Sequence, residues 1–237
     1  MKTTLRDNLI RLESIDSTNS FALKLANEKA GDFAVTAECQ TKGRGRMGRD
    51  FESPKGQGLY LSVLERRVLD PGLTARVAVC IAKGIEKVHG LYCDIKWPND
   101  IQVNGKKLCG ILCERMGGCV VIGFGINLLQ SEKDFGELKD IATSLALCGI
   151  KPDKEALICA ILDELDIMLD NYGQSAPYLD YYRAHSNCTG RDIYLISGNQ
   201  KIPAHCTGIT DDFELAVRLD DGSASVISSG EISLRFQ

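Results

Sequence analysis

A run of glycines and cationic side chains at residues 42–49, KGRGRMGR, is the segment of this sequence best suited to hold an anion. Glycine lets the backbone approach a ligand closely, and arginine pairs with carboxylate or phosphate through two parallel hydrogen bonds. The whole chain carries a net charge of −4, so this positive charge is local. The segment predicts an anion-binding loop, with an ordinary solvated basic loop as the alternative.

The glycines of this loop also match the spacing of a dinucleotide-binding fingerprint, Gly43-x-Gly45-x-x-Gly48. That fingerprint has to follow a strand and open a helix. Here the segment DFESPKGQG follows, and its proline and two glycines do not favour a helix. No Gly-Lys-Ser/Thr sequence ends the loop, so the sequence does not predict a P-loop either.

The segment KWPND at residues 96–100 combines a cation, a rigid turn, a carboxylate and the only tryptophan of the chain. Trp97 could stack on a purine or pack in the core. Asp100 could orient a metal ion or an amine, or cap the turn. Lys107 follows an Asn104-Gly105 hairpin turn and could serve the same chemistry or simply protect a strand edge.

The segment GFGINL at residues 123–128 ends an apolar strand with two glycines and Asn127. Glycine inside a strand often marks the close approach of a ligand or of another backbone. Tight packing between strands is the alternative explanation.

These segments need a scaffold, and hydrophobic periodicity indicates one in which helices alternate with strands. Helices are predicted after Ser17-Thr18-Asn19 up to Gly31, from Leu73 to about Gly90, around 157–168 and over 178–183; strands are predicted at 33–39, 59–65, 94–97, 101–103, 108–114 and 120–128. Residues 40–58 lack periodicity and predict a long, functional loop. After Asn187, short strands at 192–196, 201–209, 214–219, 223–227 and 231–236 predict a small barrel, with a boundary near residue 185.

Composition excludes several classes of protein. No apolar run approaches the ~20 residues of a membrane helix, and the N-terminus has no signal-peptide core, so we expect a cytoplasmic protein. The acidic net charge argues against binding to nucleic acid or to an anionic membrane. The 10 cysteines are spread along the chain without a Cys-x-x-Cys pair, and most sit in apolar surroundings, so we expect reduced, structural thiols.

The ordered set GRGRMGR, KWPND, KLCGILCE and GFGINL resembles the biotin protein ligase family, in its short form without an N-terminal DNA-binding domain. STN at 17–19, AECQ at 37–40 and GEISLR at 230–235 extend the resemblance over nearly the whole chain. The resemblance implies an α+β fold, with a mixed sheet flanked by helices as in class II synthetases, followed by a C-terminal SH3-like β-barrel. The implied domains are residues 1–185 for catalysis and 186–237 for the barrel.

The resemblance also implies the site residues. Arg46, Lys107 and Asp100 would be catalytic. Biotin would be bound by Ser17, Thr18, Asn19, Gln40, Gly43, Arg44, Gly45, Arg46, Lys107 and Gly110, and the nucleotide by Arg44, Arg46, Trp97, Asn99, Lys107 and Asn127. Ser, Thr and Gln side chains can satisfy the two N–H groups and the carbonyl of the ureido ring of biotin. The arginines and Lys107 would neutralise the carboxylate and the α-phosphate as the two anions meet.

The implied reaction consumes ATP, with Mg²⁺ whose ligands the sequence does not identify, and forms biotinoyl-5′-AMP. A lysine of a biotin carboxyl carrier protein, or of the carrier domain of a biotin-dependent carboxylase, would then attack the anhydride. A homodimer formed through the central sheet is also compatible with the resemblance. Three alternatives stay open: a biotin-dependent repressor, for which the residues before Ser17 leave no room for a helix-turn-helix domain; a lipoate or octanoate transferase, which lacks such a Gly-Arg loop; and a non-catalytic biotin-binding module.

Overall fold

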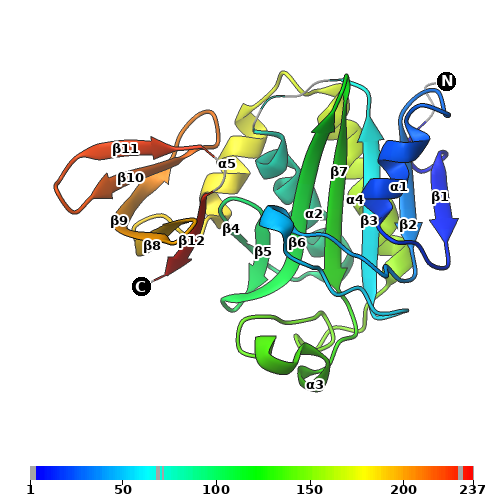
Figure 1. The fold of residues 1–237 in the computed structure, drawn as a ribbon, viewed down its shortest axis with the longest axis horizontal. Coiled ribbons are helices and arrows are strands. Elements are labelled where there is room, and N and C mark those ends of the chain that lie inside the picture. Colours follow the sequence, from blue (N-terminus) through cyan, green and yellow to red (C-terminus); the bar gives the residue numbers. More distant parts are fainter. Residues whose placement is uncertain (1–3, 68–69, 71, 229–231, 237) are drawn as a thin grey trace.

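A mixed seven-stranded sheet forms the centre of the molecule in the computed structural model, which describes residues 4–67, 70, 72–228 and 232–236 (Figure 1). In spatial order its strands are β1 (Leu9–Leu12), β2 (Phe33–Ala37), β3 (Gly58–Glu65), β7 (Cys119–Asn127), β6 (Lys106–Met116), β5 (Asp100–Val103) and β4 (Asp94–Lys96). Strands β1 and β2 run parallel, whereas every other neighbouring pair is antiparallel. The predicted mixed sheet is confirmed.

Helices cover the two faces of this sheet unequally (Figure 1). The long helices α2 (Leu73–His89) and α4 (Lys154–Asp170) pack behind it, with α5 (Ala176–His185) beside them, and α1 (Thr18–Leu25) lies in front. The rear layer contains most of the hydrophobic core, whereas a smaller apolar cluster lies under α1. The front face beyond α1 is left for loops.

The helix predicted from Leu73 to about Gly90 is confirmed as α2, and local chemistry explains where it ends. Gly90 adopts φ 63°, a left-handed conformation that glycine reaches without steric cost, and its N–H bonds the carbonyl of Glu86. The sequence pattern does not indicate β1 or the short α3 (Glu132–Phe135). Both are four residues long, which is too short for a periodic signal.

A second, antiparallel sheet of five strands follows α5. Its spatial order is β11 (Ala224–Ile227), β10 (Leu215–Leu219), β9 (Gln200–Ile209), β8 (Asp192–Ser197) and β12 (Ile232–Phe236). This separate sheet fits the small SH3-like domain that the sequence predicted, while residues 230–231 of the GEISLR segment lie outside the described residues. The domain boundary near residue 185 stays a proposal, placed at the end of α5 and before β8.

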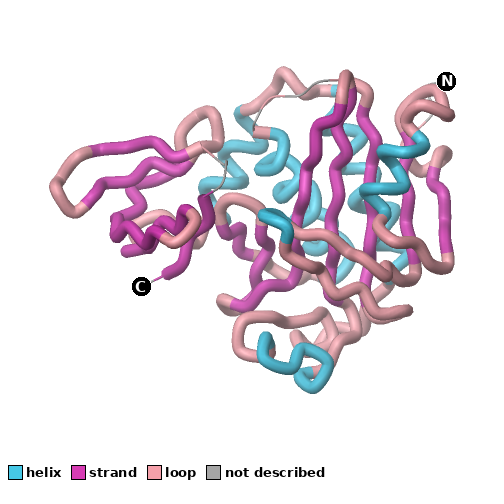
Figure 2. Tube along the Cα trace, in the orientation of Figure 1, coloured by secondary structure: helices cyan, strands magenta, loops and turns pink. Residues whose placement is uncertain are grey.

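The long loop predicted at 40–58 crosses the front face of the first sheet (Figure 2). It folds back on itself, because Gln40 pairs with Ser53 and Arg44 with Asp50 as isolated antiparallel bridges. A single 3₁₀ turn, η1 (Arg46–Gly48), forms its tip. We call residues 40–53 the Gly-Arg loop. Of the described helices, none is long and apolar enough to cross a membrane.

Candidate active site

Glycines open the front face of the first sheet beneath the Gly-Arg loop. Gly125 on β7 stands between Tyr60 on β3 and Gly110 on β6 in the strand register. A Cβ atom added to Gly125 would lie 2.4 Å from a ring carbon of Phe51, and one added to Gly123 would lie 1.9 Å from Oδ1 of Asn19. Larger residues at these positions would displace the side chains above them. The glycines of GFGINL therefore leave room for the side chains of Phe51 and Asn19, and the close approach of a ligand to them stays a prediction.

A network of hydroxyl and amide groups occupies one side of this face. The N–H and the hydroxyl of Thr18 both donate to Oε1 of Gln40, at 2.8 and 3.0 Å, and Nε2 of Gln40 donates to Ser53 at 2.8 Å. The hydroxyl of Ser62, which is fully buried on β3, lies 2.7 Å from Oγ1 of Thr18 and 2.6 Å from Oδ1 of Asn19. These groups offer both donors and acceptors within a small space.

The start of α1 explains how these residues reach the network. Ser17 is the N-cap of α1 and its side chain accepts a hydrogen bond from the N–H of Ser20, so it fixes where the helix begins. Ser17, Thr18 and Asn19 are all buried, with exposed fractions of 3–5%. The structure thus brings together the Ser-Thr-Asn element and Gln40 as predicted, although their contact with biotin stays a prediction.

Arg44 of the Gly-Arg loop is joined to this network through Glu114 on β6. The Oε2 atom of Glu114 accepts two hydrogen bonds, one from Arg44 at 2.6 Å and one from Nδ2 of Asn19 at 2.8 Å. Nδ2 of Asn19 also donates to the carbonyl of Leu112 at 3.2 Å. One terminal nitrogen of Arg44 is held in this way, and the guanidinium keeps further N–H groups that can face an anion.

Arg46, at the start of the 3₁₀ turn, is joined instead to the KWPND segment. Its guanidinium donates to Oδ1 of Asn99 at 3.2 Å, and Nδ2 of Asn99 donates to the carbonyl of Ile111 at 2.9 Å. Burial lowers the pKa of Arg46 from its ordinary value, with Asp100 opposing and Arg49 adding to the shift. A partly desolvated guanidinium interacts more strongly with an incoming anion than one in water does.

Lys107 and Asp100 form an ion pair across adjacent strands, with 2.6 Å between Nζ and Oδ1. Asp100 stands opposite Gly110 in the register of β5 and β6. A Cβ atom added to Gly110 would lie 3.0 Å from Nζ of Lys107, so the lysine side chain passes over this glycine. The structure therefore brings Lys107, Asp100 and Gly110 together on the same open face.

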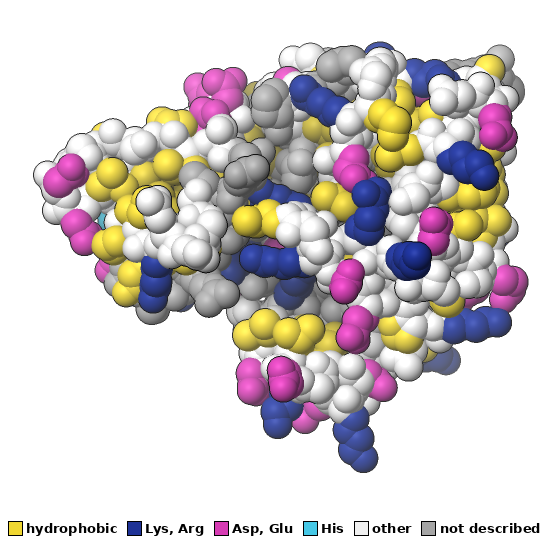
Figure 3. All heavy atoms as spheres, in the orientation of Figure 1, with side chains coloured by type: hydrophobic (Ala, Val, Ile, Leu, Met, Phe, Trp, Pro, Cys, Tyr) yellow, Lys and Arg dark blue, Asp and Glu magenta, His cyan; other side chains and the backbone are white. Residues whose placement is uncertain are grey.

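Two cavities adjoin these side chains. A narrow one of about 60 Å³ is lined by Thr18, Gln40, Phe51, Lys107 and other residues of both groups. A broad, open one of about 1490 Å³ lies along the Gly-Arg loop and reaches Thr74 and Pro98. Lys and Arg side chains lie along part of the hollow at the centre of this face, with hydrophobic and acidic side chains along the rest (Figure 3). Arg44, Arg46 and Asn99 line both cavities.

Three predicted site residues, Trp97, Asp100 and Asn127, line neither cavity, although Asp100 is paired with Lys107, which lines the narrow one. Trp97 is only 2% exposed and lies in the hydrophobic core, with its indole N–H donating to the carbonyl of Phe213 at 3.2 Å. The amide of Asn127 donates to the carbonyl of Thr143 at 3.0 Å and accepts from Gln130 at 3.2 Å. The structure gives the side chains of Trp97 and Asn127 a packing role, and their contact with a nucleotide stays a prediction.

Three further residues of the site were missed by the sequence analysis. Ser62 could have been noticed as a small polar residue inside an otherwise apolar strand, whose alternation places it on the same face as Tyr60. Phe51 and Glu114 carried no such signal, because their importance depends on how the loop folds back over β6 and β7. The described residues contain no cluster of three His, Cys, Asp or Glu side chains that could hold a metal ion.

Comparisons with known proteins show which family this sequence and fold resemble. The model of the biotin/lipoate A/B protein ligase family matches residues 12–127. The bifunctional ligase/repressor BirA of Bacillus subtilis is 44% identical over 236 residues, which cover 94% of this chain and 73% of that protein. The biotin–[acetyl-CoA-carboxylase] ligase of Mycobacterium tuberculosis is 31% identical, covering 91% and 85%. A structure of biotin protein ligase from Aquifex aeolicus in complex with biotin and ATP superposes with a TM-score of 0.85 at 28% identity, covering 97% of this chain and 99% of that chain.

Proposed function

This chain belongs to the biotin protein ligase family, and we propose that it activates biotin with ATP and transfers the biotin to a lysine of a carrier protein. The observation that carries the proposal is the convergence of two kinds of group on one face of the sheet. A network of hydroxyls and amides around Thr18 and Gln40 lies beside the cations Arg44, Arg46 and Lys107. The first set suits a ureido ring and the second suits a carboxylate with a phosphate.

Biotin binds with its ureido ring against Thr18, Asn19 and Gln40. These groups hydrogen-bond to one another and to Ser62, so the ureido ring replaces part of these hydrogen bonds when it binds. Ser17 holds the start of α1 and thereby the position of the two residues that follow it.

Entry of biotin requires the Gly-Arg loop to move. The narrow cavity of about 60 Å³ is far smaller than the roughly 300–1000 Å³ of ordinary ligand pockets, and the ring of Phe51 fills the space above Gly125. The ring also packs edge-to-face on Tyr60, with 6.4 Å between centroids. Displacement of Phe51 enlarges the cavity, and closure of the loop over the bound ligand then excludes water.

In the first step a carboxylate oxygen of biotin attacks the α-phosphorus of ATP, and pyrophosphate leaves. The central difficulty is the repulsion between two anions, which Arg44, Arg46 and Lys107 reduce. Lys107 contributes an ammonium held by Asp100, and Arg46 contributes a guanidinium held by Asn99. The product is biotinoyl-5′-AMP, a mixed anhydride.

In the second step the amine of the carrier lysine attacks the carbonyl carbon of the anhydride, an amide forms, and AMP leaves. A free lysine has a pKa of about 10.4, so the amine has to lose a proton near neutral pH. In this proposal Asp100, which is paired with Lys107, orients the amine or accepts its proton. The carrier is a biotin carboxyl carrier protein or the corresponding domain of a biotin-dependent carboxylase.

Mg²⁺ enters this scheme with the nucleotide. Asp100, the only candidate ligand from the sequence, is paired with Lys107, and the described residues offer no metal cluster. Because Mg²⁺ is usually bound through substrate phosphates and one or two carboxylates, the residues present do not form a dedicated magnesium site. We therefore assign no step to residues that hold the ion.

Release of pyrophosphate by the purified protein tests the proposal. ATP and Mg²⁺ are supplied with biotin, with lipoate, or with neither acid. We expect release with biotin alone, and covalent biotin on an added carrier domain. Release with lipoate alone would support an acyltransferase of related fold, and binding of biotin without any turnover would support a non-catalytic module.

A further inference from the structure

The turn between β9 and β10 of the second sheet places one aromatic residue against the first sheet. Phe213 is 5% exposed, although it lies in a short connection between strands. Its ring packs edge-to-face on Tyr182 of α5, at 5.9 Å between centroids and 85° between planes. The guanidinium of Arg76 on α2 also lies over the Phe213 ring, with its central carbon 4.9 Å from the ring centroid.

The backbone of Phe213 adopts an uncommon conformation. Its φ is 61°, in the left-handed region that a bulky side chain rarely occupies. The turn is closed by hydrogen bonds between Thr210 and Glu214 and by the N–H of Phe213, which donates to Thr210 at 3.1 Å. A conformation of this kind persists where the surrounding contacts determine it, and such positions often serve a function.

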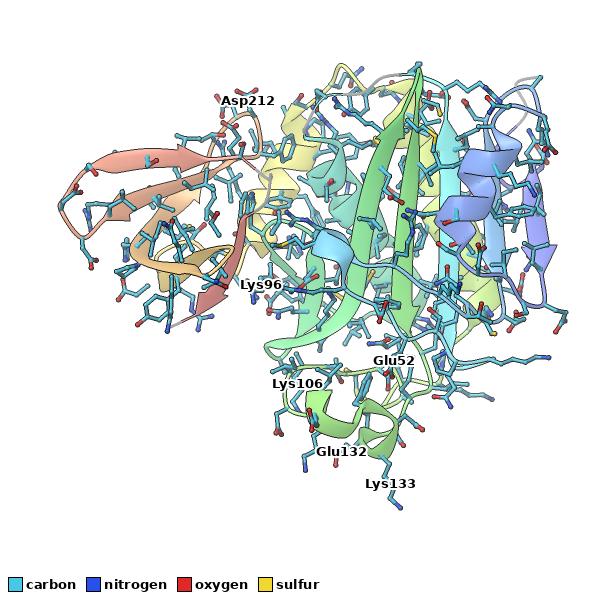
Figure 4. All side chains as sticks on the ribbon, viewed as in Figure 1. Glu52, Lys96, Lys106, Glu132, Lys133 and Asp212 are labelled. Carbon is cyan, nitrogen blue, oxygen red and sulfur yellow. The ribbon has the colours of Figure 1, made fainter. Side chains whose placement is uncertain are left out.

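This conformation directs the carbonyl of Phe213 to Trp97. The indole N–H is the only polar group of the Trp97 side chain, and it donates to this carbonyl at 3.2 Å in a buried setting. Loss of the carbonyl would leave a buried donor without a partner, which is costly. Figure 4 labels the chain neighbours of the two residues: Asp212, which precedes Phe213, on the loop near α5, and Lys96, which precedes Trp97, at the edge of the first sheet.

Trp97 begins the turn that carries two residues of the proposed active site. Asn99 holds Arg46 and Asp100 holds Lys107, at 3.2 and 2.6 Å. Arg46 and Lys107 are two of the three cations of the proposed site, so the position of the indole affects where these two side chains lie. The ureido-binding network around Thr18 and Gln40 belongs to α1, β3 and the Gly-Arg loop, and its hydrogen bonds do not involve Phe213.

We propose that Phe213 is a positioning residue for the ATP-dependent step, which acts from the second sheet through Trp97 on Asn99 and Asp100. The inference rests on the proposed function. It assigns to the β9–β10 turn a part in arranging the cations, in addition to the packing of one sheet against the other. The side chain of Phe213 fixes the turn, and the carbonyl of Phe213 fixes the indole.

The test compares Phe213→Ala with Val217→Ala, a matched control. Val217 lies on β10 of the same sheet and is also buried, with an exposed fraction of 1%, but the indole N–H of Trp97 donates to Phe213 and not to Val217. We expect Phe213→Ala to lower kcat/KM for ATP by about tenfold or more, because small misplacements of catalytic groups are costly, and to leave the Kd for biotin unchanged. Val217→Ala should change neither quantity beyond twofold.

Trp97→Phe removes the indole N–H and keeps an aromatic ring, so it separates the hydrogen bond from the packing. We expect it to raise KM for ATP, and we expect the double variant with Phe213→Ala to be no worse than the stronger single variant, because both act through one contact. Additive effects, or equal losses in Phe213→Ala and Val217→Ala, would overturn the inference. If Phe213→Ala does not fold, Phe213→Leu and Trp97→Phe form the same cycle.

Fluorescence gives a readout that does not depend on turnover, since Trp97 is the only tryptophan in the sequence. We expect a red-shifted emission in Phe213→Ala and none in Val217→Ala. An unshifted emission in Phe213→Ala would contradict the contact itself. Absence of pyrophosphate release by the unmodified protein would instead contradict the proposed function, so the two failures are distinguishable.

Discussion

The ammonium of Lys107 lies 2.6 Å from a carboxylate oxygen of Asp100, across the neighbouring strands β6 and β5. Their side chains are 35% and 23% exposed, so solvent weakens the pair only in part. The pair keeps Lys107 on the open face of the sheet before any ligand arrives. Two anionic ligands would then compete with Asp100 for the ammonium, which releases the carboxylate for the second step.

This relationship predicts a separable defect in Asp100→Asn, which keeps the shape of the side chain and removes its charge. We expect transfer from added biotinoyl-5′-AMP to a carrier domain to slow by about 100-fold, as for loss of a general base. Single-turnover biotinylation measures it, with Asp140→Asn at an exposed position as the control. Unchanged transfer would restrict Asp100 to the positioning of Lys107.

Arg46→Gly should release activated biotin into solution. The half-buried guanidinium of Arg46 is fixed by Asn99 beside the proposed phosphate site, so its loss shortens the lifetime of the bound adenylate. We expect biotinylation of bystander lysines, measured on a protein such as serum albumin. Met47→Gly is the matched control, because Met47 is exposed in the same loop at φ 58°, where glycine adds flexibility without removing a charge. Equal bystander labelling by both variants would assign the effect to loop flexibility.

The sequence was sufficient for the parts of the fold that depend on local pattern. The structure contains helix α2, which ends at Gly90, and the apolar strand β3. It also contains the antiparallel strands on either side of Asn104-Gly105. The family resemblance then supplied the mixed sheet and the small second domain. The pairing of β1 with β2 was not predictable, because a four-residue strand has too little pattern to reveal its partner.

The candidate site was predictable only in part, for a similar reason. Arg46 and Lys107 could be found from the sequence, because each lies in a short motif whose residue types and order are distinctive. Glu114 could not, because its link to Arg44 joins positions 70 residues apart. Trp97 is a residue that the sequence suggested for the site but that the structure buries. An indole can stack on a purine, yet this one is covered by the second sheet. Tertiary contacts, which a local sequence pattern does not contain, determine whether Glu114 and Trp97 belong to the site.

Buried thiols predict a loss of stability at alkaline pH. Burial raises the pKa of the Cys93 and Cys188 thiols to about 12. In the unfolded chain a thiol ionises near pH 8.5, so each group contributes stability that is complete below that pH and is lost as the pH rises toward 12. The free energy of unfolding should therefore fall with a slope of up to about 1.4 kcal/mol per pH unit for each thiol.

Urea unfolding between pH 8 and pH 11 measures this slope, and Cys93→Ala isolates one thiol. The variant is less stable at pH 8 because it leaves a small cavity, but its stability should fall less steeply as the pH rises. Parallel slopes for the two proteins would show that Cys93 ionises equally easily in both states. Val121→Ala, at another buried position, leaves a cavity but removes no ionisable group, so it provides the control, for which we expect an unaltered slope.

Gly123→Ala should disable biotin binding through Asn19. The added methyl group would lie 1.9 Å from Oδ1 of Asn19, so Asn19 has to leave its contacts with Ser62 and Glu114. We expect the Kd for biotin to rise more than tenfold and the stability to fall by about 1–3 kcal/mol, the usual cost of overpacking. Calorimetric titration and urea unfolding measure the two effects. Gly118→Ala is the matched control, because a methyl group there meets no atom within 4 Å.

The double variant Gly123→Ala/Asn19→Ala separates the clash from the chemistry. Removal of the Asn19 side chain relieves the overpacking, so most of the lost stability should return. Biotin binding should not return, because the amide that joins the ureido-binding network to Glu114 and Arg44 is then missing. Recovery of both properties together would mean that Asn19 only fills space beneath α1, and that the network binds its ligand without it.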